Sequence, residues 1–177
     1  MEYFRISLSK EIKNPLFIKG LDTSYYKHNM NRQEFERLEK MLVTYVEYSE
    51  DMTVPEVLTR PTLLISEQVK SIFQEQEETI SYKGIQLYPE KEKDAGKFSK
   101  VYWIPDSPLV ECLEREVKIL PNGTIDKLLL NARKAGERNI FRIAGIQENI
   151  TIVSLKIAEQ LIQNKLYGVA IEEVQMR

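Results

Sequence analysis

One pattern occurs twice in this chain and restricts its fold more than any other feature. It consists of a short extended run, a serine, an amphipathic segment, a glycine and a second extended run, with Ser66 and Gly84 in the first copy and Ser154 and Gly168 in the second. Serine is preferred at the N-cap of a helix, and glycine is common where a chain turns after one. Each copy therefore predicts a strand, a serine-capped helix and a returning strand.

Apolar residues at helical spacing follow each serine, which predicts the two helices. They are Val69, Ile72 and Phe73 in the first copy and Ile157, Ala158, Leu161 and Ile162 in the second. Any unit of this kind needs a serine and a glycine at these places, so duplication and chance both stay open. If the two strands of a unit share a sheet, they should form a parallel pair covered by the helix.

The rest of the chain carries further strand and helix signals. Alternating residues predict a strand over 4–8, and Asn31 is suited to cap a helix through Phe35 and Leu38. Leu42 and Tyr45 continue this helical spacing, but the β-branched and aromatic residues of 42–48 favour a strand, with the helix ending near Lys40. Helix and strand both stay open for residues 41–48. Further strands are expected over 85–89, 101–104, 140–143 and 169–174, and an exposed loop over 90–97.

Residues 107–130 support two interpretations. Ser107 followed by Pro108 suits the start of a helix. Asn122-Gly123 between two apolar runs is typical of a β-hairpin with a type I′ turn. The hairpin is the preferred interpretation.

These elements predict an α+β, or mixed α/β, fold in which two strand–helix–strand units pack their helices against a mixed sheet. A length of 177 residues suits a single domain, residues 1–177. Within it, residues 1–100 form a more variable half with the first unit. Residues 101–177 hold the hairpin and the second unit.

Charge and cysteine content limit the possible partners and compartment. The 25 basic and 27 acidic side chains leave a formal charge of −2, too small to attract nucleic acid or an anionic membrane, and neither is expected as a partner. The lone cysteine, Cys112, cannot form an internal disulfide, which fits a reducing compartment. The first ten residues do not resemble a signal peptide, so a cytoplasmic location is expected.

The chain offers little recognisable catalytic equipment. The one histidine, His28, lies in a polar stretch and is expected to be a solvated loop residue, and the apolar neighbours of Cys112 indicate a packed, unreactive thiol. Neither Ser66 nor Ser154 lies in a G-x-S-x-G motif. Metal-binding spacings and phosphate-binding glycine loops are missing from the sequence, so we expect no catalytic residues, metal or cofactor.

Acidic clusters and aromatic residues offer a binding surface instead. Acidic runs are usually solvated faces, but those around residues 47–51 and 74–78 also suit an acidic docking surface or a catalytic carboxylate pair. Of the pair Tyr102 and Trp103, one side chain should point to the core and one outward. The candidate binding residues are Glu47, Tyr48, Glu50, Asp51 and Trp103.

The C-terminal third resembles a known family. Residues 139–145 read NIFRIAG; Ile152-Val153-Ser154 and a helix with Ala158-Glu159 follow, and LYGV at 166–169 precedes a final strand ending at Val174. Over residues 139–174 this pattern resembles bacterial immunity proteins found beside polymorphic toxins, a family long described as a domain of unknown function. Weaker similarity occurs at 64–69 and 102–105.

The resemblance implies a cytosolic, non-enzymatic protein that binds a cognate toxin domain and blocks its active site or substrate entry. It transfers no catalytic residue and leaves open which toxin is bound and the oligomeric state. Two alternatives are a small hydrolase or transferase that uses acidic residues, and a housekeeping protein-interaction domain.

Overall fold

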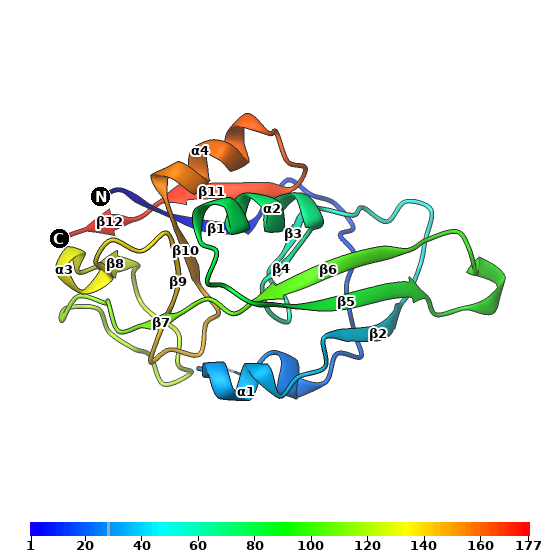
Figure 1. Ribbon diagram of the computed structural model, residues 1–177, viewed down its shortest axis with the longest axis horizontal. Coiled ribbons are helices and arrows are strands. Elements are labelled where there is room, and N and C mark those ends of the chain that lie inside the picture. Colours follow the sequence, from blue (N-terminus) through cyan, green and yellow to red (C-terminus); the bar gives the residue numbers. More distant parts are fainter. Residues whose placement is uncertain (28) are drawn as a thin grey trace.

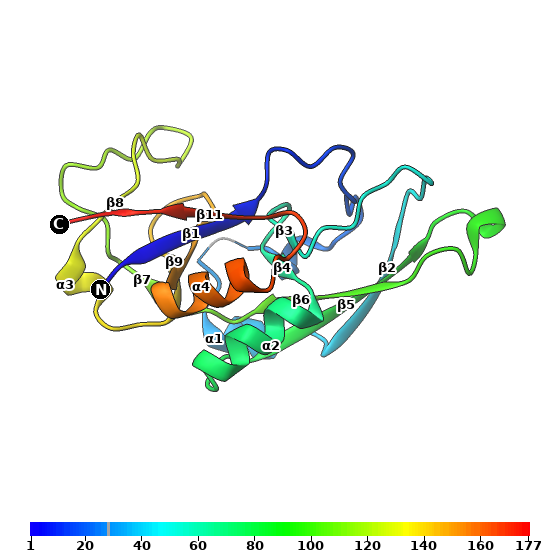
Figure 2. The ribbon, with the colours of Figure 1, turned by 90° about the horizontal axis from the view of Figure 1, so that it is seen from above.

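Two five-stranded sheets lie side by side in the computed structural model, which describes residues 1–27 and 29–177 (Figures 1 and 2). Sheet 1 has the order β11-β1-β10-β9-β7, formed by Val169–Glu173, Tyr3–Leu8, Thr151–Ser154, Ile140–Ile143 and Leu109–Val110. Sheet 2 has the order β2-β5-β6-β4-β3, formed by Met41–Val46, Tyr82–Pro89, Lys100–Pro105, Leu64–Ile65 and Val57–Leu58. A two-stranded sheet pairs β8 (Leu129–Leu130) with β12 (Gln175–Met176). The predicted α+β class is confirmed, with the strands divided between separate sheets.

The two predicted units have the same topology. In β4-α2-β5, helix α2 spans Glu67–Gln76, and in β10-α4-β11, helix α4 spans Leu155–Gln163. The two strands of each unit run parallel but are not neighbours, because antiparallel β6 or β1 lies between them. The expected parallel direction within one sheet is confirmed, but the two strands are not hydrogen-bonded to each other, because a strand from outside the unit lies between them.

The backbone repeats this correspondence, but the serine side chains do not. The Ser66 N–H donates to Glu56 O at 2.9 Å and the Ser154 N–H to Asn139 O at 2.8 Å, just before β3 and β9. Ser66 Oγ accepts the N–H of Val69 at 3.3 Å, as predicted for a cap. The Ser154 hydroxyl makes no cap bond and donates to Asn139 Oδ1 at 3.2 Å, so the predicted side-chain cap is wrong there. The amide oxygen competes successfully for the hydroxyl.

Helices α2 and α4 lie side by side over a shared apolar core (Figure 2). Its buried members include Val57, Ile65, Val69, Phe73, Ile140, Val153, Ile157 and Leu161. Burying each such side chain contributes about 1.5–3 kcal/mol. The other face of sheet 2 packs against residues 16–35, and a third cluster around Phe141 and Ile152 includes Cys112. The core thus covers both faces of sheet 2 near α2.

The first half follows the sequence closely. Asn31 caps α1 (Arg32–Glu36) through a capping box with Glu34, as predicted for this N-cap, and β2 begins at Met41, so residues 41–46 adopt the strand and not the alternative helix. A 3-10 turn, η1, spans Thr23–Tyr25. The 90–97 loop contains a second, η2 (Glu92–Asp94), and Asp94 is buried rather than exposed.

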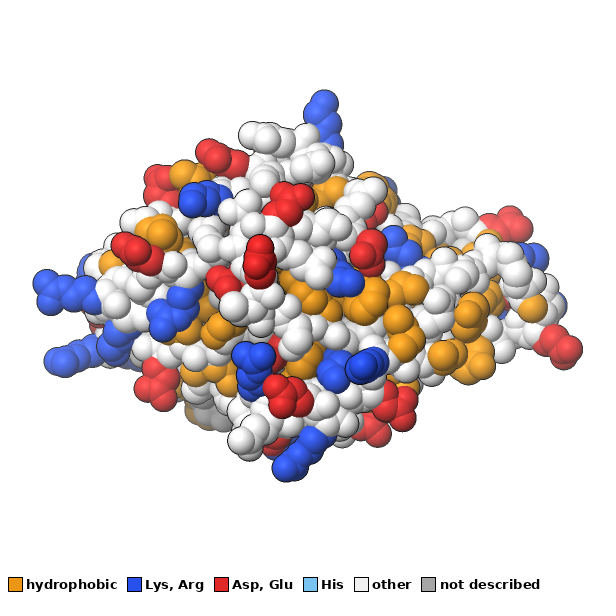
Figure 3. All heavy atoms as spheres, viewed as in Figure 1, with side chains coloured by type: hydrophobic (Ala, Val, Ile, Leu, Met, Phe, Trp, Pro, Cys, Tyr) orange, Lys and Arg blue, Asp and Glu red, His pale blue; other side chains and the backbone are white. Residues whose placement is uncertain are grey.

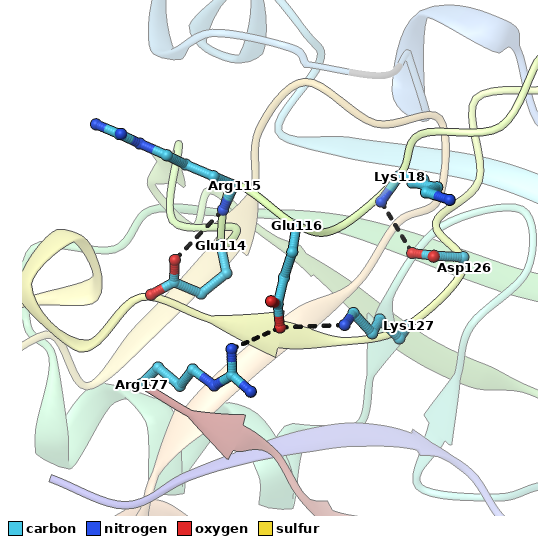
Figure 4. Close-up of polar contacts among 7 residues, drawn as sticks. All are labelled: Glu114, Arg115, Glu116, Lys118, Asp126, Lys127 and Arg177. Carbon is cyan, nitrogen blue, oxygen red and sulfur yellow. Dashed lines mark hydrogen bonds and ion pairs between the residues drawn. The ribbon is translucent and has the colours of Figure 1, made fainter.

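Residues 107–130 form extended and turn structure, not the alternative helix. Leu120 and Thr124 are joined by a backbone hydrogen bond, and only Gly123 has a positive φ, of 78°. The hairpin is confirmed, but with a three-residue loop instead of a type I′ turn, because Asn122 does not adopt the positive φ that a type I′ turn requires. Pro121 suits the second position of the turn that the Gly123 N–H closes onto Leu120 O. Nearby, Glu116 accepts from Lys127 and Arg177 at 3.1 and 2.8 Å and ties the C-terminus to this loop (Figure 4). Helix α3 spans Ala132–Ala135.

Candidate protein-binding surface

Strand β2 lies at the edge of sheet 2 and exposes one of its faces. Its register with β5 is parallel from Met41 opposite Gly84 to Val46 opposite Pro89. Met41, Val43 and Tyr45 are 42%, 51% and 56% exposed, whereas Val46 is buried. Because side chains alternate along a strand, the three exposed apolar residues share one face.

The adjacent strands extend this apolar surface. Across β5 and β6, Met41 lies in register with Gly84 and Trp103, and Tyr45 lies opposite Tyr88, which is 41% exposed. We call this surface the open face; its apolar members are Met41, Val43, Tyr45, Tyr88, Val101 and Trp103, and Gln86 lies in register between Val43 and Val101. Figure 3 shows hydrophobic side chains gathered along these strands. Exposed apolar patches of this kind mark interaction sites in folded proteins.

Gly84 makes the open face continuous. A Cβ at this position would lie 2.5 Å from Met41 Cε and 3.1 Å from Trp103 Cζ3. Without a side chain at Gly84, Met41 lies across the sheet toward Trp103. The glycine therefore joins residues of β2 and β6 that are separated by a whole strand.

Trp103 forms the end of the open face nearest α2. It is half-buried, its Nε1–H donates to Glu67 Oε2 at 2.6 Å, and Lys70 Nζ lies 3.5 Å from its ring centroid. This is a cation–π arrangement that holds the indole in place. Trp103 thus borders the core and presents part of its ring to solvent.

The other predicted binding residues lie around the end of β2. Glu47, the first residue after β2, accepts a hydrogen bond from Lys19 at 2.5 Å, which lowers the pKa of this carboxyl. Tyr48, two residues beyond the end of β2, stacks on Phe98, with 6.2 Å between the ring centroids. Glu50 and Asp51 are exposed in the following turn.

The predicted residues therefore do not form one cluster. Trp103 lies in register with Met41 at the start of β2, whereas Glu47 follows the end of this strand. Sequence reasoning missed Met41, Val43, Tyr45 and Tyr88, which make up most of the open face. The available signal was the segment MLVTYV, which has apolar residues on both faces of the strand. If a core covers only one face of such a strand, the other apolar face stays exposed.

A separate pocket of about 330 Å³ lies between the two sheets beside Asp106 and Arg142. Burial raises the pKa of the Asp106 carboxyl, and nearby Arg142 opposes the shift. Arg142 donates from Nε to Ser107 O at 3.0 Å and from Nη2 to Met30 O at 3.1 Å. The buried Ser107 Oγ has no hydrogen-bond partner in the described part of the chain, so no base is placed to activate it.

The remaining candidates have simpler structural roles. Cys112 is fully buried, as the sequence predicts, and Glu75 and Glu78 of the second acidic run are exposed. His28 lies outside the described residues. Within residues 1–27 and 29–177, no group of three His, Cys, Asp or Glu side chains is placed to hold a metal ion.

No helix in the described ranges is both long and apolar enough to cross a membrane. In comparisons with known proteins, the chain matches no family model, and no curated protein is significantly similar to it.

Proposed function

We propose that this chain is a non-enzymatic, cytoplasmic protein-binding module: an immunity protein that neutralises a cognate bacterial toxin by covering its active site. The open face is the observation that carries the proposal. Its four most exposed members are Met41, Val43, Tyr45 and Tyr88, and tyrosine is enriched where proteins bind one another. Neither nucleic acid nor a membrane is part of the proposal.

Electrostatics add to this support. Glu50 and Asp51 lie in an exposed turn just beyond the end of β2, after Glu47, which is paired with Lys19. Acidic groups beside an apolar centre suit a partner whose cleft is basic, because complementary charge raises the association rate and excludes other partners. The similarity of residues 139–174 to immunity proteins points to the same class of partner.

Co-expression with the product of the neighbouring gene tests the proposal. The wild-type chain should form a stable complex with that product and relieve its toxicity. Val43→Asp should abolish the relief because it places a charge in the open face. The matched control is Ile119→Asp, on the 119–125 hairpin, where Ile119 is 55% exposed against 51% for Val43. Failure of the wild-type chain to bind or protect would overturn the proposal.

A second candidate function is a small hydrolase or transferase that uses an acidic residue. Asp106 favours it, since a carboxyl of raised pKa in a pocket is a recurring feature of acid–base catalysis. Asp106→Asn separates the two functions. It should leave toxin protection intact if binding is the activity, and loss of protection in a folded Asp106→Asn variant would favour catalysis.

A further inference from the structure

The backbone of β2 has one edge bonded and one edge open. Gly84 N–H donates to Lys40 O and Glu90 N–H donates to Val46 O, both at 2.8 Å. In a parallel ladder these bonds recur at every second residue, so Leu42, Thr44 and Val46 direct their N–H and C=O groups toward β5. Met41, Val43 and Tyr45 direct theirs to the opposite edge. Within the described part of the chain, β5 is the only strand paired with β2.

This open edge lacks the features that normally prevent strand addition. Proteins protect exposed edges with lysine, proline, bulges or very short strands. The six residues of β2, MLVTYV, include no charged residue and no proline. Its free N–H and C=O groups belong to the same three residues that expose their side chains. A strand added here would gain backbone hydrogen bonds and contact the open face at once.

From this edge we infer how the partner binds: it contributes an extended segment that pairs antiparallel with β2 and places apolar side chains beside the open face. The inference rests on the proposed function and specifies its contact. Antiparallel pairing is the more stable of the two ladders. A basic residue of the segment should lie beside Glu50 and Asp51, which are exposed and form no ion pair with any described residue.

A second copy of the chain fits this edge less well. Pairing about a two-fold axis at Val43 would keep the apolar residues on one face, with Met41 opposite Tyr45 of the second copy. Continued past the ends of β2, this pairing would also bring Glu47, which is paired with Lys19, opposite Glu39 of the second copy, twice in each dimer. Like charges directly opposite one another destabilise a sheet. A foreign segment with basic residues avoids this repulsion.

Hydrogen exchange in the complex with the neighbouring gene's product tests the inference. On binding, the exchange rates of the Met41, Val43 and Tyr45 amides should fall by at least about 10-fold. Those of Leu42 and Thr44, already bonded to β5, are internal controls. Val43→Pro removes an open-edge donor without touching the ladder to β5, whereas Val43→Thr keeps the donor and loses apolar surface. Affinity should fall about 10- to 100-fold further with proline than with threonine. Thermal unfolding checks that both variants fold.

The possible outcomes are distinct. A complex in which the three open-edge amides are unchanged, with equal affinity for the proline and threonine variants, overturns strand addition and leaves the proposed function standing. Sedimentation showing a dimer of the chain alone, lost in Val43→Pro, assigns the edge to a second copy and also overturns the inference. Failure to form any complex overturns the inference and the proposed function together.

Discussion

Raising the pH above 9 should destabilise this protein through its one cysteine. Cys112 is fully buried, and burial raises the pKa of its thiol from the ordinary value of 9.0 to about 11, although Arg138 and Lys134 oppose the shift. In the unfolded chain the thiol ionises near pH 9. Between pH 9 and 11 the unfolded state therefore releases a proton that the folded state retains, and stability falls as the pH rises. A difference of about two pKa units between the folded and unfolded thiol corresponds to about 2.7 kcal/mol of stability.

Urea unfolding from pH 8 to 11, on the wild type and on Cys112→Ala, isolates this contribution. Tyrosine and lysine titrate in the same range, but they do so in both proteins and cancel in the difference. At pH 8 the substitution should cost about 1–2 kcal/mol, because it leaves a small cavity. Between pH 8 and pH 11 the free energy of unfolding of the wild type should fall by about 2–3 kcal/mol more than that of the variant. Stability curves that stay parallel across this range would refute the reasoning.

Three further substitutions test the packing of sheet 2 and α2. Tyr102→Phe removes a buried hydroxyl that donates to Pro55 O at 2.6 Å, so the free energy of unfolding should fall by about 1–2 kcal/mol in urea titrations; an unchanged value would contradict this bond. Gly84→Ala places a Cβ 3.1 Å from the Trp103 ring and should shift the emission of this single tryptophan, whereas an identical spectrum would show that the contact is absent. Ser66→Ala should lower the melting temperature by about 2–4 °C through loss of the α2 cap, and an unchanged melting temperature would show that this cap does not stabilise the protein.

Local signals predicted the elements that local chemistry determines. Alternation predicted β1, Asn31 as an N-cap predicted the start of α1, and Ser66 predicted the start of α2. Each of these depends on residues within one or two turns of the chain. Ser154 shows the limit of this reasoning, since its hydroxyl bonds to Asn139, fifteen residues away in sequence, and the serine alone contains no sign of that competitor.

Strand order depended on contacts that the sequence pattern does not encode. Strand β1 lies between β10 and β11, about 150 residues distant, and β6 fills the equivalent place in sheet 2. The open face was missed for the same reason. The residues of β2 show that the strand is apolar on both sides, but only the packing of residues 16–35 against Leu42 and Val46 determines which side stays uncovered.

The affinity of two tyrosine variants for the neighbouring gene's product tests the central claim most directly. Tyr45 on the open face is 56% exposed, and Tyr167, in the turn before β11, is 51% exposed. Titration calorimetry should show that Tyr45→Ser weakens binding at least about 30-fold, the range expected for a central aromatic contact, while Tyr167→Ser stays within about 2-fold of the wild type. Equal affinity for the two variants, or a greater loss for Tyr167→Ser, would contradict the assignment of the open face as the binding surface.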